Sequence, residues 1–378
     1  MKRLQVKAFG PIQQADVGFA DLTVLVGPPA TGKTLLLRLY QAIQDAAAVA
    51  ERLERHGVVE TNATSPVAAY CAGYFGGGYD DLWTSNTEVV CGGRRIGPMK
   101  LVKPNASANA ETTFCAPAQR SLAFQDGWPK PFTAFDGHPY AIRHFSECIR
   151  SYLEDLPAGE MLDSISWPEL RMAVATSIYG SSTLELKGQG TDRRVVLQPR
   201  GSSSVLSYGS WSAGQREFTP LLLGYASLVS KSYGGSVNTV ILEKPEMGLH
   251  PQAVLSMALL LLDLLARNVR VIISTHSLVV LDIVWAIREL STVKTNASIA
   301  ALCRIFNLDN PSASILDIFA AALRKEYLTY YFNCTNAGVV TEDISTLDPG
   351  DVNENIAGWG GVSGVSGRIA RIVGEVVG

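Results

Sequence analysis

The sequence predicts an α/β fold in which helices cover a largely parallel sheet. A continuously apolar, β-branched run at 22–26 leads into a segment beginning at Lys33 whose apolar residues recur at helical spacing. From residue 215 the pattern runs helix, strand, helix, strand, helix, with the strands at 239–242 and 269–273. Strands that alternate with helices pair in parallel, because each helix carries the chain back across the face of the sheet.

Shorter patterns predict the other elements. Helical spacing of apolar residues indicates helices, and alternation between Gly-rich turns indicates hairpins. In chain order these are a strand at 4–8, a helix at 33–53, a β-hairpin layer at 61–112, a returning strand at 112–116, helices at 140–156 and 168–179, and a hairpin at 182–208. The turn Gly10-Pro11 separates the first strand from the strand at 22–26, and the Gly-rich tail after residue 340 indicates a loop.

The composition is that of a folded protein without a membrane span. Hydrophobic residues make up 47% and charged residues 18% of the 378 residues, which is ample for a buried core. The net charge of -3 neither demands nor excludes nucleic acid as a partner. The six cysteines are scattered without metal-ligand spacing, which favours reduced thiols in the cytoplasm. The apolar run at 254–266 is interrupted by Asp263 and is shorter than the roughly 20 residues that a membrane span needs.

The junction after strand 22–26 carries a phosphate-binding loop. Its residues fit the pattern G-x-x-x-x-G-K-[ST] and are Gly27, Pro28, Pro29, Ala30, Thr31, Gly32, Lys33 and Thr34. Glycines let backbone N–H groups turn toward phosphate oxygens, and the N-terminus of the following helix adds partial positive charge. Lys33 is therefore predicted to reach the β- and γ-phosphates of ATP, and the Thr34 hydroxyl to be a ligand of Mg²⁺.

Three further motifs follow in a fixed order. They are Ser212-Ala213-Gly214-Gln215 before a long helix, Val240-Ile-Leu-Glu243-Lys244-Pro245-Glu246 at the end of an apolar strand, and Ser274-Thr275-His276-Ser277 at the end of the next strand. Each alone is weak evidence, since a Ser-x-Gly-Gln turn is often an N-cap and a lone His after a strand is usually structural. Their order behind a phosphate-binding loop makes them informative together.

In that order the motifs resemble those of the ABC-type ATPases, and within them the RecF, SMC and OLD branch. Residues 27–34 resemble Walker A, 212–215 the signature, Glu246-Met-Gly-Leu-His250-Pro251 the Walker B ending and D-loop of OLD-like members, and 274–277 the switch. The resemblance covers most of the chain apart from the segment 60–110. It implies a P-loop NTPase fold of the ABC-ATPase head type, with a mixed sheet, an N-terminal β layer and a helical lobe carrying the signature.

The resemblance also implies a role for each site residue. Walker A and the Q-loop residue Gln119 would bind ATP, together with Ser212, Gly214 and Gln215 of a second copy. Glu243, Thr34 and Gln119 would hold Mg²⁺, and His276 would sense the γ-phosphate. Gln125 is an alternative to Gln119, which is preferred because it directly follows the strand at 112–116. The active unit would be a symmetric homodimer with ATP in its interface, and a higher oligomer stays possible.

One departure from the family concerns catalysis. The second carboxylate of Walker B, which activates the attacking water, is replaced by Lys244. Lysine cannot act as a general base there unless its pKa is depressed by several units. The chain is then a natural ATP-binding switch with slow hydrolysis, or an engineered form that traps the ATP-bound dimer, or one in which Glu246 supplies the carboxylate. Impaired hydrolysis with retained ATP binding is the preferred hypothesis, and a Lys244 that merely pairs with a neighbouring acid is the structural alternative.

Length limits the domain organisation. We expect a single head over 1–378, with a nucleotide-binding core lobe at 1–120 and 215–378 and a helical signature lobe at 121–214. The segment between the Q-loop and the signature is too short for coiled-coil arms. The acids Glu342, Asp343, Asp348 and Asp351 are interpreted as loop acids, so no nuclease domain is predicted.

A head without its own effector implies an effector on another protein. Similar stand-alone OLD-like ATPases belong to bacterial anti-phage defence or toxin–antitoxin-like systems, in which they hold or release a toxin or nuclease. Two other functions stay open. A RecF-like DNA-repair ATPase would need a basic groove. A transporter subunit would need an aromatic residue near the N-terminus to stack on adenine, and the candidate there, Phe9, is interpreted as a core residue.

Overall fold

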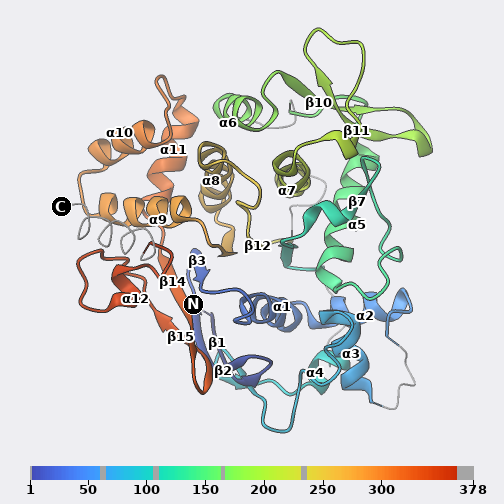
Figure 1. Cartoon of the computed structure of the whole chain (residues 1–378), viewed down its shortest axis with the longest axis vertical. Coiled ribbons are helices and arrows are strands. Elements are labelled where there is room, and N and C mark those ends of the chain that lie inside the picture. Colours follow the sequence, from blue (N-terminus) through green and yellow to red (C-terminus); the bar gives the residue numbers. More distant parts are fainter. Residues whose placement is uncertain (1, 60–64, 105–109, 163–166, 231–235, 364–378) are drawn as a thin grey trace, which may run out of the picture.

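The structure, a computed structural model, describes residues 2–59, 65–104, 110–162, 167–230 and 236–363. Its main feature is a mixed sheet with the strand order β5-β4-β1-β2-β15-β14-β3-β13-β12-β6 (Figure 1). These strands are β1 (Lys2–Phe9), β2 (Ile12–Phe19), β3 (Leu22–Val26), β4 (Glu88–Cys91), β5 (Arg94–Arg95), β6 (Thr113–Ala116), β12 (Thr239–Glu243), β13 (Arg270–Ser274), β14 (Tyr327–Thr335) and β15 (Gly338–Asp343). The α/β class and the mixed sheet predicted from the sequence are confirmed.

The sheet has a parallel centre and an antiparallel flank. Strands β14, β3, β13, β12 and β6 are parallel neighbours. On the other side β2, β1, β4 and β5 pair antiparallel and form the predicted N-terminal β layer. The parallel centre places the carboxyl ends of β3, β12 and β13 at one edge, where loops commonly bind ligands.

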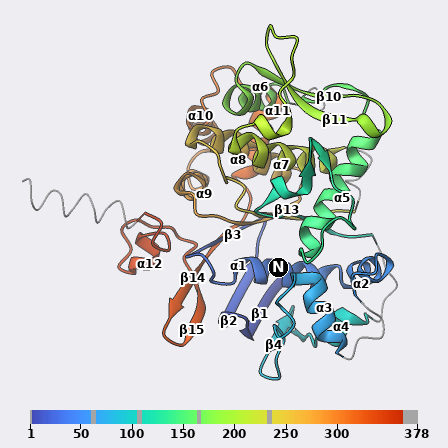
Figure 2. The same ribbon diagram turned by 45° about the vertical axis from the view of Figure 1, so that its right-hand side comes forward.

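Helices cover both faces of this sheet (Figures 1 and 2). They are α1 (Lys33–Gln44), α2 (Ala46–Arg55), α3 (Pro66–Phe75), α4 (Met99–Val102), α5 (Tyr140–Asp155), α6 (Pro168–Val174), α7 (Ala213–Val229), α8 (Pro251–Ala266), α9 (Leu278–Ser291), α10 (Thr295–Ile305), α11 (Ala313–Ala322) and α12 (Glu354–Ala357). A π-helix at Ala175–Tyr179 continues α6. Small strands complete the fold: β7 (Phe124–Gln125) pairs with β8 (Trp128–Pro129), and β10 (Ser182–Lys187) pairs with β9 (Gly159–Glu160) and β11 (Arg194–Pro199).

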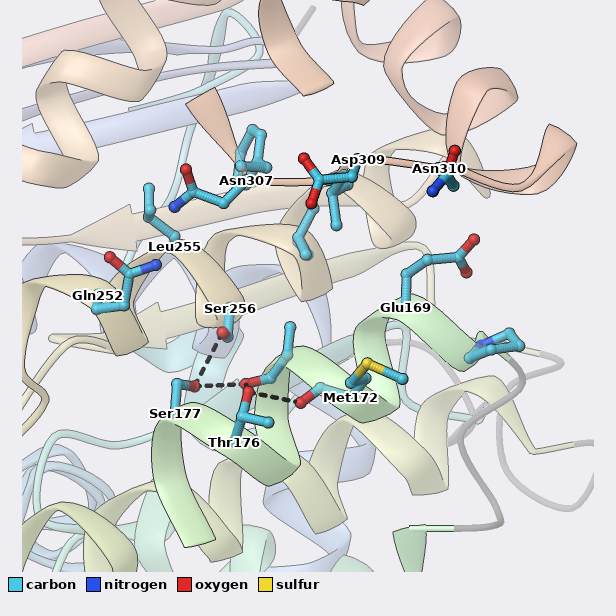
Figure 3. A pocket seen from close by; sticks show the side chains of 15 residues that line it. Glu169, Met172, Thr176, Ser177, Gln252, Leu255, Ser256, Asn307, Asp309 and Asn310 are labelled. Carbon is cyan, nitrogen blue, oxygen red and sulfur yellow. Dashed lines mark hydrogen bonds between the residues drawn. The ribbon is translucent and has the colours of Figure 1, made fainter. Parts of the chain in front are cut away.

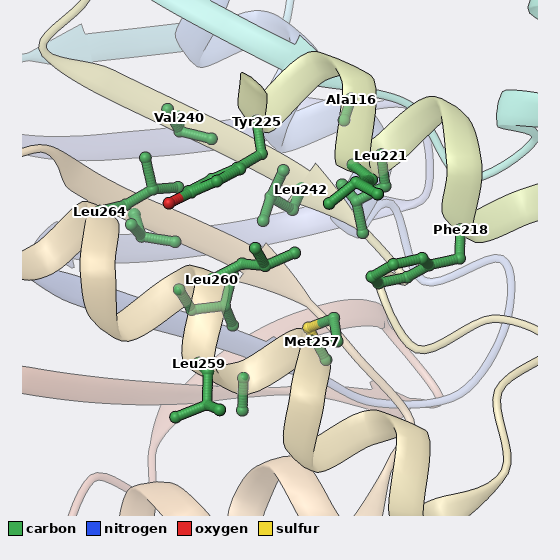
Figure 4. Close-up of a cluster of buried hydrophobic side chains, with 14 of the residues drawn as sticks. Ala116, Phe218, Leu221, Tyr225, Val240, Leu242, Met257, Leu259, Leu260 and Leu264 are labelled. Carbon is green, nitrogen blue, oxygen red and sulfur yellow. The ribbon is translucent and has the colours of Figure 1, made fainter. Parts of the chain in front are cut away.

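The central strands are apolar on both sides because both faces are buried. In β12, Val240 and Leu242 belong to the core under α7 and α8, whereas Ile241 belongs to the core under α1. Figure 4 shows the first of these cores. There α7 and α8 pack on β12 through Phe218, Leu221, Tyr225, Met257, Leu260 and Leu264. This packing fixes α7, and therefore the signature turn at its start, against the Walker B strand.

Four of the element predictions were wrong. Strand β2 was missed between Gly10 and Leu22. The segment predicted as a β layer at 61–112 contains helices α3 and α4, with only the short β4–β5 hairpin as expected; 60–64 and 105–109 lie outside the described residues. The tail predicted as a loop after residue 340 begins inside strand β15, which pairs with β14 and places Glu342 and Asp343 in a strand, whereas Asp348 and Asp351 lie in a loop as expected. The secondary structure of each segment is stabilised by the sheet or core that it packs against. The local sequence pattern does not show which remote segment will be that partner.

The fourth error is the long helix predicted at 33–53, which is two helices separated at Asp45. The Asp45 carboxylate accepts hydrogen bonds from the Thr112 N–H and hydroxyl, both at 2.8 Å, and from the Thr113 N–H at 3.0 Å. Asp competes well for nearby backbone donors. The helix is therefore interrupted at Asp45, and the hydrogen bonds of the Asp45 carboxylate connect the end of α1 to the start of β6.

A buried ionic cluster joins α5 to the core. The Glu111 carboxylate lies 2.7 Å from His144 Nε2 and 3.1 Å from Arg52 Nη2, and accepts a hydrogen bond from the Tyr140 hydroxyl at 2.7 Å. Burial alone would lower the pKa of His144, but Cys148 and Glu111 raise that pKa to about 10. Burial would raise the pKa of Glu111, but His144 and Arg52 lower it to about 2.

We expect His144→Gln to destabilise the fold by about 3 kcal/mol near pH 6, because it removes one of the two cations, His144 and Arg52, that neutralise the buried Glu111 carboxylate. A raised folded-state pKa contributes stability that is complete below the unfolded pKa of roughly 6.5 and is lost as pH rises through the folded pKa. The cost of the variant should therefore shrink between pH 6.5 and about 10. Urea unfolding across this range tests it. The control is Arg150→Gln, which removes the exposed Arg150–Glu154 pair of the same helix and should cost under about 1 kcal/mol at each pH.

Candidate nucleotide-binding site

Three segments meet at the carboxyl edge of the parallel strands. The loop 27–32 follows β3, residues 244–250 follow β12, and residues 275–277 follow β13. In the register of β12 and β13, Glu243 lies opposite Ser274. The sheet therefore brings Walker A together with the Walker B and switch motifs, which lie more than two hundred residues later in the sequence.

The phosphate-binding loop needs glycine at two positions. Gly27 has a φ of 138°, and a Cβ there would lie 2.7 Å from the Phe332 carbonyl oxygen of β14. Gly32 has a φ of 85°, and a Cβ there would lie 2.7 Å from Ile12 Cγ1. The loop is thus pressed between neighbouring strands, while its crest at 28–30 is exposed. Glycine alone combines these backbone angles with such close approaches.

Lys33 lies folded into the loop that it follows. Its ammonium donates to the carbonyls of Gly27 and Pro28, both at 2.7 Å, and to the Thr31 hydroxyl at 3.0 Å. Burial and the positive charge of Lys244 lower the pKa of Lys33 to about 8. A multiply charged anion at the loop would reverse this effect, since an opposite charge favours the protonated amine.

Two oxygen groups that are suited to a hard cation, the Thr34 hydroxyl and the Glu243 carboxylate, lie near Lys33. The Thr34 hydroxyl donates to Glu243 Oε2 at 3.1 Å, and Arg38 Nε lies 3.5 Å from Glu243 Oε1. The Glu243 side chain is only 2% exposed, and its Oε1 has no hydrogen-bond partner among the residues that the structure describes. A hydroxyl and a carboxylate suit Mg²⁺, which takes its remaining ligands from water and phosphate. Thr34 and Glu243 therefore fit the predicted metal site.

Arg38 is a site residue that the sequence interpretation missed. It follows Thr34 by four residues in α1, and residues at that spacing share a helix face. Helical geometry could therefore have placed Arg38 beside Glu243. Its charge partly neutralises the buried carboxylate while Thr34 holds the other oxygen.

Glu246 fastens the switch segment to the Walker B turn. Its Oε1 accepts hydrogen bonds from the Thr275 hydroxyl at 2.8 Å and from the His276 N–H at 2.9 Å. His276 Nε2 is buried without a hydrogen-bond partner in the described structure. Burial, Lys33 and Lys244 lower the pKa of His276 to about 4, so the ring is neutral near neutral pH. An unpartnered ring nitrogen at this edge is suited to meet a phosphate oxygen.

Arg120 is a second residue whose role the sequence did not reveal. It is fully buried and donates to the carbonyls of Glu243 at 2.9 Å, Lys244 at 3.2 Å and Glu217 at 3.0 Å. Burial lowers its pKa to about 10. The guanidinium joins the segment after β6 to the Walker B turn and to α7. Only the tertiary fold explains a buried arginine here, because every partner is a backbone carbonyl.

The two candidate Q-loop glutamines are both exposed. Gln119 precedes the 3-10 helix Arg120–Ala123, and Gln125 lies in β7. Neither is hydrogen bonded to Thr34 or Glu243 in the part of the chain that is described. The preference for Gln119 as an ATP and Mg²⁺ contact remains a prediction.

The signature turn is an N-cap in contact with the D-loop. The Ser212 hydroxyl accepts from the Gln215 N–H at 3.2 Å, and the Gln215 side chain accepts from the Ser212 N–H at 3.0 Å, which is a capping box. Ser212 is exposed at the start of α7. A Cβ on Gly214 would lie 2.7 Å from the carbonyl oxygen of Gly248. The two glycines therefore let the signature and D-loop backbones touch within one copy of the chain.

A large cavity lies away from this edge (Figure 3). It has a volume of about 770 Å³ and lies between α6 with its π-helix, α8 and residues 306–310. Its lining residues include Glu169 and Asp309 but no Lys, Arg or His. Without cationic side chains it cannot offset the charge of a triphosphate, so the nucleotide site is assigned to the strand edge.

Phe9 is unavailable to a nucleotide. It is fully buried and makes edge-to-face contacts with Phe75 and Trp83, at ring-centroid distances of 5.8 and 5.7 Å. Its interpretation as a core residue is confirmed. Across the described residues, none of the helices combines the length and apolar character that a bilayer crossing requires.

A family model matches part of the chain. The family described as "AAA domain, putative AbiEii toxin, Type IV TA system" matches residues 138–282, which is less than half of the chain. That segment carries the signature, Walker B and switch motifs, and the phosphate-binding loop lies before it. The motifs and the parallel sheet that presents them resemble those of ABC- and SMC-type P-loop ATPases. A search of curated proteins gives no match for this chain.

Several solved structures are similar in outline to this chain. An SMC head bound to the C-winged helix domain of ScpA is 10% identical, with a TM-score of 0.43 over 90% of this chain and 96% of that one. The SMC head domain from Thermotoga maritima is 10% identical, with a TM-score of 0.37 over 90% and 97%. An SMC head from Pyrococcus furiosus, bound to the C-terminal domain of ScpA, is 10% identical, with a TM-score of 0.37 over 91% and 96%.

Gly214→Ala is expected to destabilise the protein by about 1–3 kcal/mol, because the added methyl group must displace the Gly248 carbonyl. The matched control is Gly209→Ala, since a Cβ at Gly209 meets nothing within 4 Å. That control should stay within about 0.5 kcal/mol of the wild type. Urea unfolding of both variants measures the difference. Equal stabilities would show that the signature and D-loop do not pack as described.

Proposed function

We propose that this P-loop ATPase is an ATP-dependent switch that dimerises around nucleotide. In each site, Lys33 and the loop 27–32 of one copy bind ATP, Thr34 and Glu243 hold Mg²⁺, and Ser212 with Gly214 of the other copy meets the γ-phosphate. The observation that carries the proposal is the Thr34–Glu243 hydrogen bond at 3.1 Å beside the buried Lys33 ammonium. It joins the metal-binding groups of Walker A and Walker B at one point, which is what Mg²⁺-ATP requires.

The exposed signature turn supports the two-chain part of the proposal. Ser212 and Gly214 start a helix of 17 residues, and their capping box leaves the Ser212 side chain at the surface. Helix N-termini attract phosphate through partial positive charge and free N–H groups. Within one copy the signature contacts the D-loop rather than the phosphate-binding loop. A second copy, related by two-fold symmetry, is the partner that completes both sites.

We further propose that the switch controls a separate effector, a toxin or nuclease of an anti-phage or toxin–antitoxin system. The family description naming an AbiEii toxin and a type IV toxin–antitoxin system supports this class of partner. The chain after His276 supports an effector in trans, because β14 pairs with β3 and so completes the ATPase sheet. That segment therefore serves the nucleotide-binding core.

Two variants test the sandwich separately from ATP binding. Lys33→Ala should weaken ATP binding at least about tenfold, because it removes charged hydrogen bonds to phosphate. Ser212→Asp should bind ATP normally, since Asp is also a good N-cap, but should not dimerise, because its charge repels the partner's phosphate. Ser212→Asn is the neutral control and should dimerise. Calorimetry gives the affinities, and mass measurement with and without Mg²⁺-ATP gives the oligomer. A monomer at saturating ATP in all forms would contradict the sandwich.

Lys244→Glu tests whether hydrolysis is limited by the missing base. We expect ATP turnover to rise by orders of magnitude, roughly 10²–10⁴-fold, because a carboxylate next to the metal site can activate water. Phosphate release under single-turnover conditions measures the rate, and Lys244→Gln is the control that removes the lysine without adding a base. An unchanged rate in Lys244→Glu would show that this position does not decide hydrolysis. Glu246, which is bound to the switch segment, would then be the next carboxylate to vary.

A further inference from the structure

Among the charged residues of the Walker B motif, Glu243 and Glu246 have assigned partners, and the side chain of Lys244 has no assigned role in the proposed switch. We infer that its ammonium is a second phosphate ligand, which acts with Lys33 and His276 to retain the terminal phosphate of a nucleoside triphosphate. The inference rests on the proposed function and adds a specificity determinant to it. At the position where the family has a carboxylate that promotes hydrolysis, this chain would then have a cation that binds the unhydrolysed nucleotide.

The backbone of Lys244 is held in a costly conformation. Its φ of 46° lies in the left-handed region, which side chains other than Gly, Asn and Asp rarely occupy. Three hydrogen bonds fix it there: its N–H donates to the Ser274 carbonyl at 2.8 Å, and its carbonyl accepts from Arg120 at 3.2 Å and from the Met247 N–H at 3.1 Å. Strain that the surroundings hold in place is commonly found at functional sites.

The left-handed backbone of Lys244 determines the direction in which its side chain leaves the main chain. In β12, Ile241 and Glu243 face α1, and the alternation would turn the next residue to the opposite face. The left-handed turn at Lys244 interrupts this alternation just beyond the metal-binding carboxylate. The hydrogen bond to Ser274 also holds Lys244 beside the switch segment that contains His276. Electrostatic coupling of Lys244 to both Lys33 and His276 agrees with a shared site.

The charges around Lys244 are unbalanced in a way that an anion would correct. Each of the two nearby carboxylates has one oxygen hydrogen bonded to another group: Glu243 Oε2 to Thr34, and Glu246 Oε1 to the switch segment. Among the ion pairs of the described residues, Lys244 appears in none. The structural alternative, in which Lys244 pairs with a neighbouring acid, is therefore not realised there, although Glu243 Oε1 and Glu246 Oε2 have no hydrogen-bond partner in the described structure. Two lysines and an unpartnered His276 Nε2 at one edge form a receptor for a multiply charged anion.

The position of Lys244 next to the switch favours the terminal phosphate. Lys33 is anchored in the loop that is proposed to bind the inner phosphates, whereas Lys244 directly follows β12 and His276 lies just after β13. A diphosphate would leave this second lysine without its ligand. The pair thus distinguishes ATP from ADP by charge.

The test compares the affinities of the full-length chain for ATP and ADP, each with Mg²⁺, by isothermal titration calorimetry. Lys244→Met should weaken ATP binding about tenfold or more, the usual value of a charge-assisted hydrogen bond, and ADP binding less than about threefold. Lys244→Arg should retain most of the ATP preference, because it keeps the charge. Lys103→Met, at an exposed lysine away from the strand edge, is the matched control and should change neither affinity.

A second neutral variant guards against misfolding. Lys244→Asn removes the charge but tolerates the left-handed backbone, so it should fold even where Lys244→Met does not. If the neutral variants lose ATP and ADP affinity equally, or lose neither, Lys244 is not a terminal-phosphate ligand. That outcome leaves the switch intact as long as the wild type binds ATP and dimerises. If the wild type binds no ATP, the proposed function itself fails.

Discussion

The parallel register of β3, β13 and β12 is the constraint on which the site depends. Because these strands run side by side in one direction, their carboxyl ends deliver the phosphate-binding loop, the switch and the Walker B acid to one edge. The hydrogen bond between the Thr34 hydroxyl and Glu243 Oε2 is a direct consequence of that register. A slip of one residue would turn Glu243 into the apolar core under α7, since side chains alternate along a strand.

The rest of the edge is arranged to favour an anion. One oxygen of each of the two acids nearest the switch, Glu243 and Glu246, accepts hydrogen bonds from hydroxyl or backbone donors. The cations Lys33 and Lys244 are held by backbone geometry, and neither forms an ion pair among the described residues. The proposed triphosphate would supply the anionic charge that these two cations lack.

Nucleotide binding can be relayed through contacts that are already in place. Glu246 connects the turn after β12 to the switch after β13, and Gly248, two residues further, touches Gly214 of the signature. Arg120 ties the same turn to α7. A shift at the γ-phosphate position would therefore reach the surface that a second copy is proposed to contact. Packed turns with little free volume transmit small displacements well.

Much of the chemistry was determined by the sequence alone. The phosphate-binding loop, the Walker B acid and the switch histidine are local patterns, and the buried strands that precede them are recognisable from continuous apolar runs. The order of helices and strands between residues 215 and 291 also followed from periodicity, since the elements there are long and largely buried.

Only the tertiary structure decided the rest, because it depends on partners that are remote in the chain. Strands β2, β14 and β15 are ordered by pairing with neighbours, and Asp45 interrupts a helix by bonding to β6. The buried Arg120, the left-handed Lys244 and the contact of Gly214 with Gly248 likewise arise between segments. The sequence shows which residue types can bind phosphate. Their relative positions come from long-range packing, which no local pattern encodes.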